Sequence, residues 1–190
     1  MESLITFIAT AFNEPFYNKS FITSIMMQTD KNFNAIVWNN GLANIPDNVI
    51  DNDILYRSSE RNTGNWGTAN RQQAIDECTT EYIIQTSVQD YWLPQSVEYI
   101  NKVLDEHKPD ILIWNSVNHL VGPCQVLDST VAWSKIDWGN FALRTDIARK
   151  VRIRQSEYCS DFLYLQDLIQ GGHIDPKKIM KLPLLLTIHN

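Results

Sequence analysis

The sequence has few cysteines and no long apolar run. Its cysteines, Cys78, Cys124 and Cys159, lie far apart and form no CxxC pair, a pattern typical of a reducing compartment. No apolar stretch reaches the ~20 residues that a membrane-spanning helix needs, and no basic leader precedes the first apolar run. We therefore expect a cytoplasmic protein without a transmembrane segment.

Positive charge is also scarce. The sequence has 16 Lys and Arg residues against 22 Asp and Glu residues, a formal net charge of −6. Binding to a nucleic-acid backbone requires a concentrated Lys/Arg surface, whereas the basic residues here are scattered except within residues 144–154. That stretch fits a diphosphate, an anionic acceptor or a solvated face. We therefore expect no nucleic-acid partner.

Two glycine-rich phosphate-binding motifs are missing as well. There is no GxGxxG after the first apolar run and no GxxxxGK[ST] in the chain, which argues against dehydrogenases and P-loop nucleotidases. A diphosphate could instead bind at the start of the helix that follows residues 64–67, where Arg71 adds guanidinium donors. The alternative is that Arg71 is an ordinary surface residue of that helix.

Hydrophobic patterning predicts an α/β fold. Short β-branched runs predict strands at residues 4–10, 35–38, 54–57, 81–86, 110–117, 141–143 and 182–188. Helical spacing predicts helices after Pro15, over residues 67–78, from Pro94, over 145–151 with Thr145 as the N-cap, and over 161–169. This alternation is typical of βαβ units, which build a mostly parallel central sheet flanked by helices. Without repeats or linkers, residues 1–190 are expected to form a single domain.

Unusual polar residues follow the predicted strands where each strand ends. They are Thr10 to Glu14, Asn39 to Gly41, Arg61 to Gly64 and Ser87 to Asp90. In open α/β sheets, ligands bind outside the carboxyl ends of the strands. Each group by itself is compatible with plain turn chemistry. Their coincidence predicts one ligand-binding crevice.

Several segments resemble, in the correct order, the inverting GT-A glycosyltransferases of the bacterial and viral group that builds surface polysaccharides. ITFIATAFNEP resembles the first strand and its nucleotide-binding loop, and SIMMQTDKNFNAIVWNNG and RNTGNWGTANRQQAI resemble the two segments that follow. EYIIQTSVQDYWLPQSVEYI resembles the strand and acidic loop that carry the DXD motif. The similarity covers residues 4–118 and continues more thinly through SKIDWGNFALRTDIARK, DFLYLQDL and LLLTIHN.

The resemblance implies a single GT-A domain with the nucleotide-diphospho-sugar transferase fold. Residues 1–118 would bind the nucleotide sugar, and residues 119–190 would hold the acceptor and the catalytic base. The implied reaction moves a hexosyl or deoxyhexosyl group, with inversion, from a nucleotide-diphosphate donor, by family preference a UDP-sugar, to a glycan or other hydroxyl acceptor. The chain is short for the family, which leaves open a partner protein or a homo-oligomer.

The resemblance also implies a donor site with a weakened metal centre. The implied nucleotide-sugar residues are Thr10, Phe12, Asn13, Glu14, Asn39, Asn62, Trp66, Arg71, Ser87, Gln89 and Asp90. Asn39 replaces a family aspartate that reads the uracil edge, which makes a preference for uridine less secure. The family's Asp-x-Asp-Asp sequence is Ser87-Val88-Gln89-Asp90 here, so the DXD motif is degenerate. Asp90 and His189 are the implied ligands of Mn2+ or Mg2+, with imidazole favouring Mn2+.

Inverting transfer needs one base for the acceptor hydroxyl. The resemblance implies Asp167 in DFLYLQDL, with Asp161 as the second choice. The expected acceptor shelf is Trp138, Gly139 and Asn140, because aromatic rings pack against sugar CH groups, although Trp138 could equally belong to the core. Two alternatives stay open: a catalytically silent nucleotide-sugar or glycan binding protein, and an interaction protein that uses the same scaffold.

Overall fold

The computed structural model describes residues 3–11, 15–40, 54–59, 64, 67–118, 125–155, 157 and 159–189. In chain order the elements are β1 (Ile5–Ala11), α1 (Pro15–Met26), β2 (Phe33–Asn40), β3 (Ile54–Ser59), α2 (Thr68–Glu77), β4 (Tyr82–Ser87), β5 (Asp90–Trp92), α3 (Ser96–His107), β6 (Ile111–Asn118), β7 (Val126–Leu127), η3 (Trp138–Asn140), β8 (Phe141–Arg144), α4 (Thr145–Ala148), α5 (Ser160–Gln170), η4 (Pro176–Lys178) and β9 (Ile179–His189). The predicted α/β class is confirmed.

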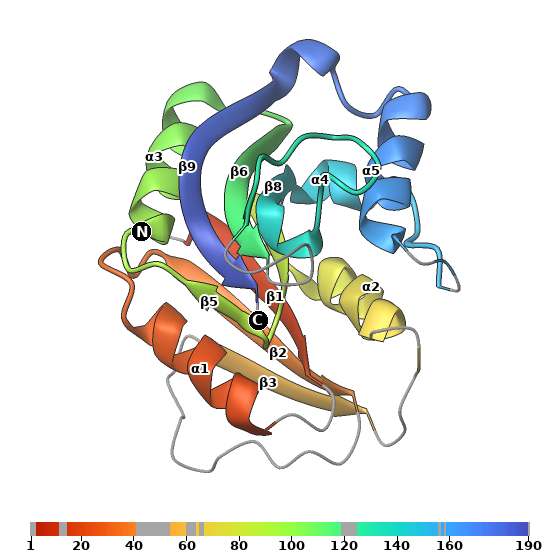
Figure 1. Ribbon diagram of the computed structural model, residues 1–190. Helices are drawn as coiled ribbons and strands as arrows, with labels where there is room; N and C mark the ends of the chain where they lie inside the picture. The colour runs from red at the N-terminus through yellow and green to blue at the C-terminus, as the bar shows by residue number, and fades with distance from the viewer. Residues whose placement is uncertain are drawn as a thin grey trace.

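The strands form one curled sheet (Figure 1). Their order is β3-β2-β1-β4-β8-β6-β9-β5, and β7 pairs with β6. Strands β3, β2, β1 and β4 are parallel, as the alternation of strands and helices predicts. Strand β8 is antiparallel to both β4 and β6, and β5 is antiparallel to β9. The sheet is therefore parallel in its first half and mixed in its second, because β5 and β8 are entered through turns instead of crossover helices.

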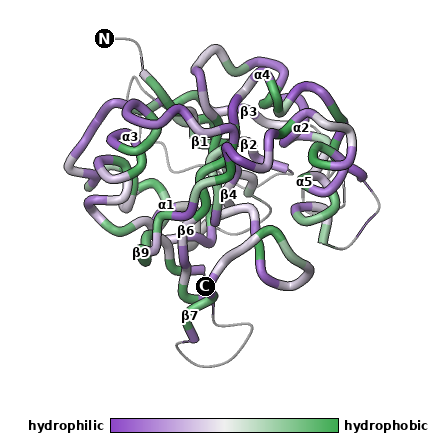
Figure 2. Tube along the Cα trace, turned by 90° about the horizontal axis from the view of Figure 1, so that it is seen from above, coloured by the Kyte–Doolittle hydropathy of each residue, from purple (hydrophilic) through white to green (hydrophobic). Residues whose placement is uncertain are grey.

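Helices cover both faces of the sheet. Helices α1 and α3 lie on one face and α2, α4 and α5 on the other, and Figure 2 shows β1 and β4 between them. Successive side chains of β1 alternate between the faces, so that Phe7 belongs to the core under α1 and α3 and Ile8 to the core under α2 and α5. Both side chains are fully buried, as expected for a central parallel strand.

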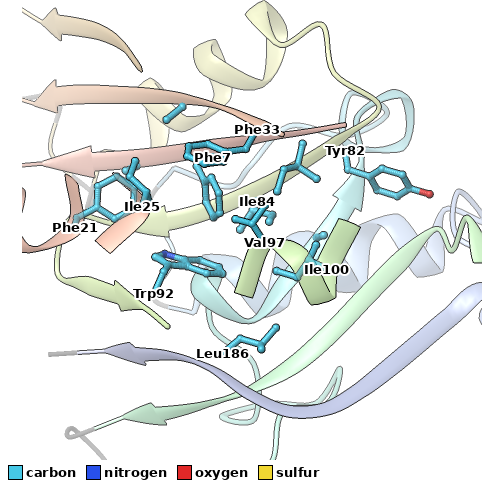
Figure 3. Packing of buried hydrophobic residues seen from close by; sticks show 14 of the residues in the cluster. Phe7, Phe21, Ile25, Phe33, Tyr82, Ile84, Trp92, Val97, Ile100 and Leu186 are labelled. Carbon is cyan, nitrogen blue, oxygen red and sulfur yellow. The ribbon is translucent and has the colours of Figure 1, made fainter. Parts of the chain in front are cut away.

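The core under α1 and α3 is built around aromatic rings (Figure 3). The ring of Trp92 makes edge contacts with Phe7 at 4.8 Å and with Trp114 at 5.8 Å between ring centroids. Such edge-to-face pairs are favourable beyond the apolar area they bury. Because Trp92 is on β5, two residues after Asp90, this core also fixes the short strand that carries Asp90.

Strand β9 contains a bulge that bends it across the sheet (Figure 1). Leu182 pairs with Trp114 and Leu185 with Asn115, so Pro183 lies within the irregularity. Proline suits this place because it has no N–H to donate to a neighbouring strand. Beyond the bulge, β9 pairs with both β6 and β5, which places His189 opposite Asp90.

The element boundaries differ from the predicted ones in small ways. Helix α3 begins at Ser96 instead of Pro94, and Thr145 begins α4 without capping it through its side chain. Of the cysteines, Cys78 and Cys159 are free thiols, and Cys124 lies outside the described residues. No helix in the part of the chain that the structure describes is long and apolar enough to cross a membrane.

The buried side chain of Gln28 is expected to contribute to the stability of the fold. Its buried amide donates to the Ser24 and Leu93 carbonyls at 3.0 and 2.9 Å and accepts from the Val97 N–H at 3.0 Å, joining α1 to the start of α3. Gln28→Met keeps the size but leaves buried polar groups without partners. We expect the free energy of unfolding, measured in urea, to fall by about 2–3 kcal/mol.

The matched control for this change is Gln95→Met, at an exposed position beside the same helix start. We expect it to alter the unfolding free energy by no more than about 0.5 kcal/mol. Equal losses in the two variants would contradict the assignment of Gln28 as a link between the helices.

Candidate functional site

A cavity of about 520 Å³ lies at the carboxyl ends of β1, β2, β4, β6 and β9. Its lining includes Thr10, Ala11, Asn40, Ser87, Asn118 and His189 from these strand ends, Gly67 and Arg71 from the start of α2, and Asp137, Trp138, Asp161 and Phe162 from the second half of the chain. Three of the four polar groups predicted to share one crevice contribute to this lining, whereas residues 61–63 of the fourth group lie outside the described residues. Its volume is in the range of small-molecule binding sites.

The predicted nucleotide-sugar residues fall into three groups. Thr10, Arg71, Ser87, Gln89 and Asp90 line the cavity. Phe12, Asn13, Glu14, Asn62 and Trp66 lie outside the described residues. Asn39 is buried in β2 and is not part of the lining, whereas the next residue, Asn40, is.

Arg71 places a buried positive charge in the cavity wall. Its side chain is almost wholly inaccessible, its Nη1 donates to the Thr86 carbonyl at 2.7 Å, and its guanidinium lies 5.6 Å from the centre of the Trp138 ring. Burial lowers the pKa of Arg71 to about 10, against the opposing effect of Asp90, Asp137 and Asp161. The guanidinium therefore stays charged at neutral pH.

The Asp90 carboxylate is held by several donors. Its Oδ1 lies 2.6 Å from Nδ1 of His189, and its Oδ2 accepts from the Ser87 N–H at 2.8 Å and from the Thr86 hydroxyl. The same hydroxyl accepts a hydrogen bond from the Trp92 indole at 3.3 Å. Asp90 is thus tied to the end of β9 and, through Thr86, to the aromatic core.

The three residues predicted as an acceptor shelf have different surroundings. Trp138 lines the cavity and also contacts Tyr164 at 5.7 Å between ring centroids, so it belongs to both the cavity wall and the core. Gly139 packs against Asp90, and a Cβ there would lie 2.9 Å from Asp90 Oδ2. Asn140 is buried, and its amide is 3.4 Å from the Trp114 carbonyl. Of the three, only Trp138 is part of the lining.

The predicted metal ligands, Asp90 and His189, bind each other. Among the residues that the structure covers, no group of three or more His, Cys, Asp or Glu side chains is arranged to hold a metal ion. Mn2+ and Mg2+ prefer oxygen ligands that include carboxylates, and neither Ser87 nor Gln89 has a carboxylate. Both oxygens of Asp90 already accept hydrogen bonds from the protein. The donor set in this arrangement does not fit a divalent ion.

Two partly buried carboxylates face the cavity from the second half of the chain. Asp137 and Asp161 each accept a hydrogen bond from the backbone N–H of the following residue, at 2.6 and 2.7 Å. Burial, with a contribution from Asp137, raises the pKa of Asp161 to about 7. Burial and the nearby Asp90 raise the pKa of Asp137. A carboxyl group that titrates near neutral pH is suited to exchange a proton with a ligand.

Asp161 and Asp167, the two predicted bases, are placed differently on α5. Asp161 lines the cavity, whereas Asp167 does not and instead forms a two-point ion pair with Arg154 at 2.6 and 2.9 Å. Asp161 and Asp167 are six positions apart, which corresponds to a rotation of about 600° around the helix axis, or about 240° beyond one full turn. The two side chains therefore point in different directions.

Asp137 and Trp133 are two of the residues near the cavity that sequence reasoning missed. Asp137 comes directly before the Trp138 turn, and a carboxylate between two large apolar residues was the available signal. Trp133 is 57% exposed, and its ring makes an edge contact at 5.6 Å with Phe162, which lines the cavity. An exposed indole beside a cavity offers an apolar face to a bound ligand.

The fold matches those of glycosyltransferases. No family model matches the chain, and no curated protein matches it in sequence. S. aureus TarS has a TM-score of 0.80 at 16% identity, over 100% of this chain and 37% of that chain. TarS 1-349 in complex with UDP-GlcNAc has a TM-score of 0.77 at 16% identity, over 99% of this chain and 58% of that one. This chain has a GT-A-like glycosyltransferase fold.

A second glycosyltransferase shares this GT-A-like fold. The mannosyltransferase PcManGT from Pyrobaculum calidifontis, in complex with GDP-Man and Mn2+, has a TM-score of 0.70 at 13% identity, over 100% of this chain and 57% of that chain. The present chain spans between 37% and 60% of the lengths of these structures. The fold expected from the resemblance in sequence is thereby confirmed.

The raised pKa of Asp161 predicts a gain of stability in Asp161→Asn. Because the folded pKa of about 7 lies above the usual value of 3.8, the wild-type chain loses stability as pH rises from about 4 to about 7, and the loss persists above pH 7. The amide removes this penalty. We expect the Tm of the variant to exceed that of the wild type by about 3–8 °C at pH 8 and to match it at pH 4.

Thermal unfolding at pH 4, 6 and 8 measures this difference. Asp167→Asn is the control on the same helix, since it removes an ion pair outside the cavity lining and should bring no gain at pH 8. A difference in Tm between wild type and Asp161→Asn that does not change with pH would count against the raised pKa.

Proposed function

We propose that this chain is an inverting glycosyltransferase that moves a sugar from a nucleotide-diphosphate donor to a hydroxyl acceptor. The observation that carries the proposal is that one cavity combines a buried cation, Arg71, with a carboxyl group of near-neutral pKa, Asp161. The likeness of the fold to TarS with UDP-GlcNAc and to PcManGT with GDP-Man supports a nucleotide sugar as the donor.

In this proposal the donor lies against the carboxyl ends of β1, β2 and β4. Thr10, Asn40 and Ser87 offer polar groups along that edge. The amide of Asn40 has both donor and acceptor atoms, as recognition of a nucleobase edge requires, and a UDP-sugar is the first donor to test. Arg71 stabilises the negative charge that grows on the diphosphate as its bond to the sugar breaks.

Asp161 is the proposed general base. It accepts the proton of the acceptor hydroxyl while the hydroxyl oxygen bonds to the anomeric carbon on the face opposite the diphosphate. The electrons of the broken sugar–oxygen bond leave with the diphosphate, and a single displacement of this kind inverts the anomeric centre. Asp137 assists by keeping the pKa of Asp161 high.

The acceptor side is proposed to be the aromatic rim of the cavity. Trp138 in the wall and Trp133 beside Phe162 present apolar rings, which suit the CH faces of a glycan. In this proposal the chain acts in polysaccharide biosynthesis in the cytoplasm. Further acceptor contacts come from a partner protein or a second copy of the chain.

A nucleotide-sugar binding protein without transfer activity is the second candidate. Ser87 and Gln89 stand where the family has acids, and the remaining Asp90 is engaged by His189, which favours this alternative. Tight binding of UDP-sugars without release of UDP, with saccharides or water as acceptors, would distinguish it from the transferase.

The choice of base predicts a difference between two variants. We expect Asp161→Asn to lower the rate of UDP release from UDP-glucose, UDP-galactose or UDP-GlcNAc by about 10²–10⁴-fold, with unchanged affinity for UDP. Asp167→Asn should retain the rate within about threefold, because its partner Arg154 is outside the cavity lining. The reverse result would return the role of base to Asp167.

The pKa of Asp161 predicts the pH dependence of turnover. The base is active when deprotonated, so the rate should rise with pH and level off above about 7. Asp137→Asn removes a neighbouring negative charge that raises this pKa, and the inflection should move to lower pH. An inflection at the same pH in the wild type and Asp137→Asn would show that another group controls the rate.

A further inference from the structure

Asp90 has the one carboxylate in the segment Ser87-Val88-Gln89-Asp90, and both of its oxygens are hydrogen-bonded within the protein. Oδ1 lies 2.6 Å from His189 Nδ1, while Oδ2 accepts from the Ser87 N–H and the Thr86 hydroxyl. A cation bound by either oxygen would have to displace one of these donors. The hydrogen bonds therefore compete with metal coordination at Asp90.

The backbone of η3 covers the same carboxylate. The Cα of Gly139 is so close that an added Cβ would lie 2.9 Å from Oδ2. The position of Gly139 is itself fixed, since its carbonyl accepts from the Trp114 indole at 2.9 Å and from the Thr187 hydroxyl at 3.2 Å. Space for a hydrated ion beside Oδ2 would require the η3 turn to move.

Arg71 already places a permanent positive charge in the wall of the cavity. Arg71 is buried near the carboxylates of Asp90, Asp137 and Asp161. Its Nη1 donates a hydrogen bond to the carbonyl of Thr86, and the hydroxyl of Thr86 donates to Asp90. A guanidinium has five N–H donors in a planar fork, which suits two phosphate oxygens. Positive charge for a diphosphate is thus present without an added ion.

We propose that this cavity binds a nucleoside diphosphate without a divalent cation, with Arg71 providing the compensating charge. In this arrangement Asp90 is a positioning residue: it joins the β4–β5 turn to the end of β9 through His189 and keeps that side of the cavity closed. The inference rests on the proposed function, because the diphosphate in question is that of the proposed donor.

Calorimetric titration of the wild-type chain with UDP, in EDTA and in excess MnCl2, tests the proposal without any variant. We expect the two Kd values to agree within about twofold. A Kd at least about tenfold tighter with Mn2+ would overturn the inference while supporting the proposed function. Absence of UDP binding in both solutions would overturn the proposed function and the inference together.

Variants then identify the source of the positive charge. Arg71→Gln should weaken UDP binding at least about tenfold in EDTA, since it removes a charge-assisted contact. The matched control is Arg152→Gln, which removes an equal charge from an exposed side chain paired with Asp76 on the surface, and which should leave the Kd unchanged. Equal Kd values for these two variants would overturn the role of Arg71.

Asp90→Asn separates a positioning residue from a metal ligand. The amide keeps the size of the side chain but loses the charge, and we expect the ratio of the Kd values in EDTA and Mn2+ to stay near one, as in the wild type. A ratio that favours Mn2+ in the wild type and falls to one in Asp90→Asn would identify Asp90 as a metal ligand and overturn the inference.

Discussion

Strand β1 is buried on both faces along its whole length, and this constraint organises the rest of the molecule. A strand without a solvent-facing side needs helices above and below it, and α1 and α3 supply one layer while α2, α4 and α5 supply the other. With both faces sealed, polar groups can reach a ligand only beyond the end of the sheet. The candidate site accordingly lies at the carboxyl ends of the strands.

At that edge, the cost of burying charge links the functional groups to one another. A buried guanidinium is tolerated when carboxylates surround it, and Arg71 has Asp90, Asp137 and Asp161 nearby. The same desolvation raises the pKa of Asp161. The burial that raises the pKa of Asp161 also holds the Arg71 guanidinium, so the two properties that the proposed transfer requires have one physical origin.

Much of the fold could be predicted because its strands and helices carry strong patterns. Strands β1, β4 and β6 each begin one residue later than expected, whereas β5 and β7 are too short to leave a periodic signal. Thr10, Ser87 and Asp90 were predicted site residues since they follow strand ends. Asp137 was missed because it lies in a segment without periodicity. The choice between Asp161 and Asp167 depended on which side of α5 faces the cavity, and the packing of the helix determines that.

The pairing of β5 with β9 joins residues 99 positions apart in the chain, Asp90 and His189. Contacts between such distant residues form late in folding, because a long loop must close before they contribute any stability. During synthesis, the parallel half of the sheet and its helices can assemble while β9 is still inside the ribosome. The pocket would then lack one wall, so a nascent or truncated chain could be largely folded and still be unable to enclose a ligand.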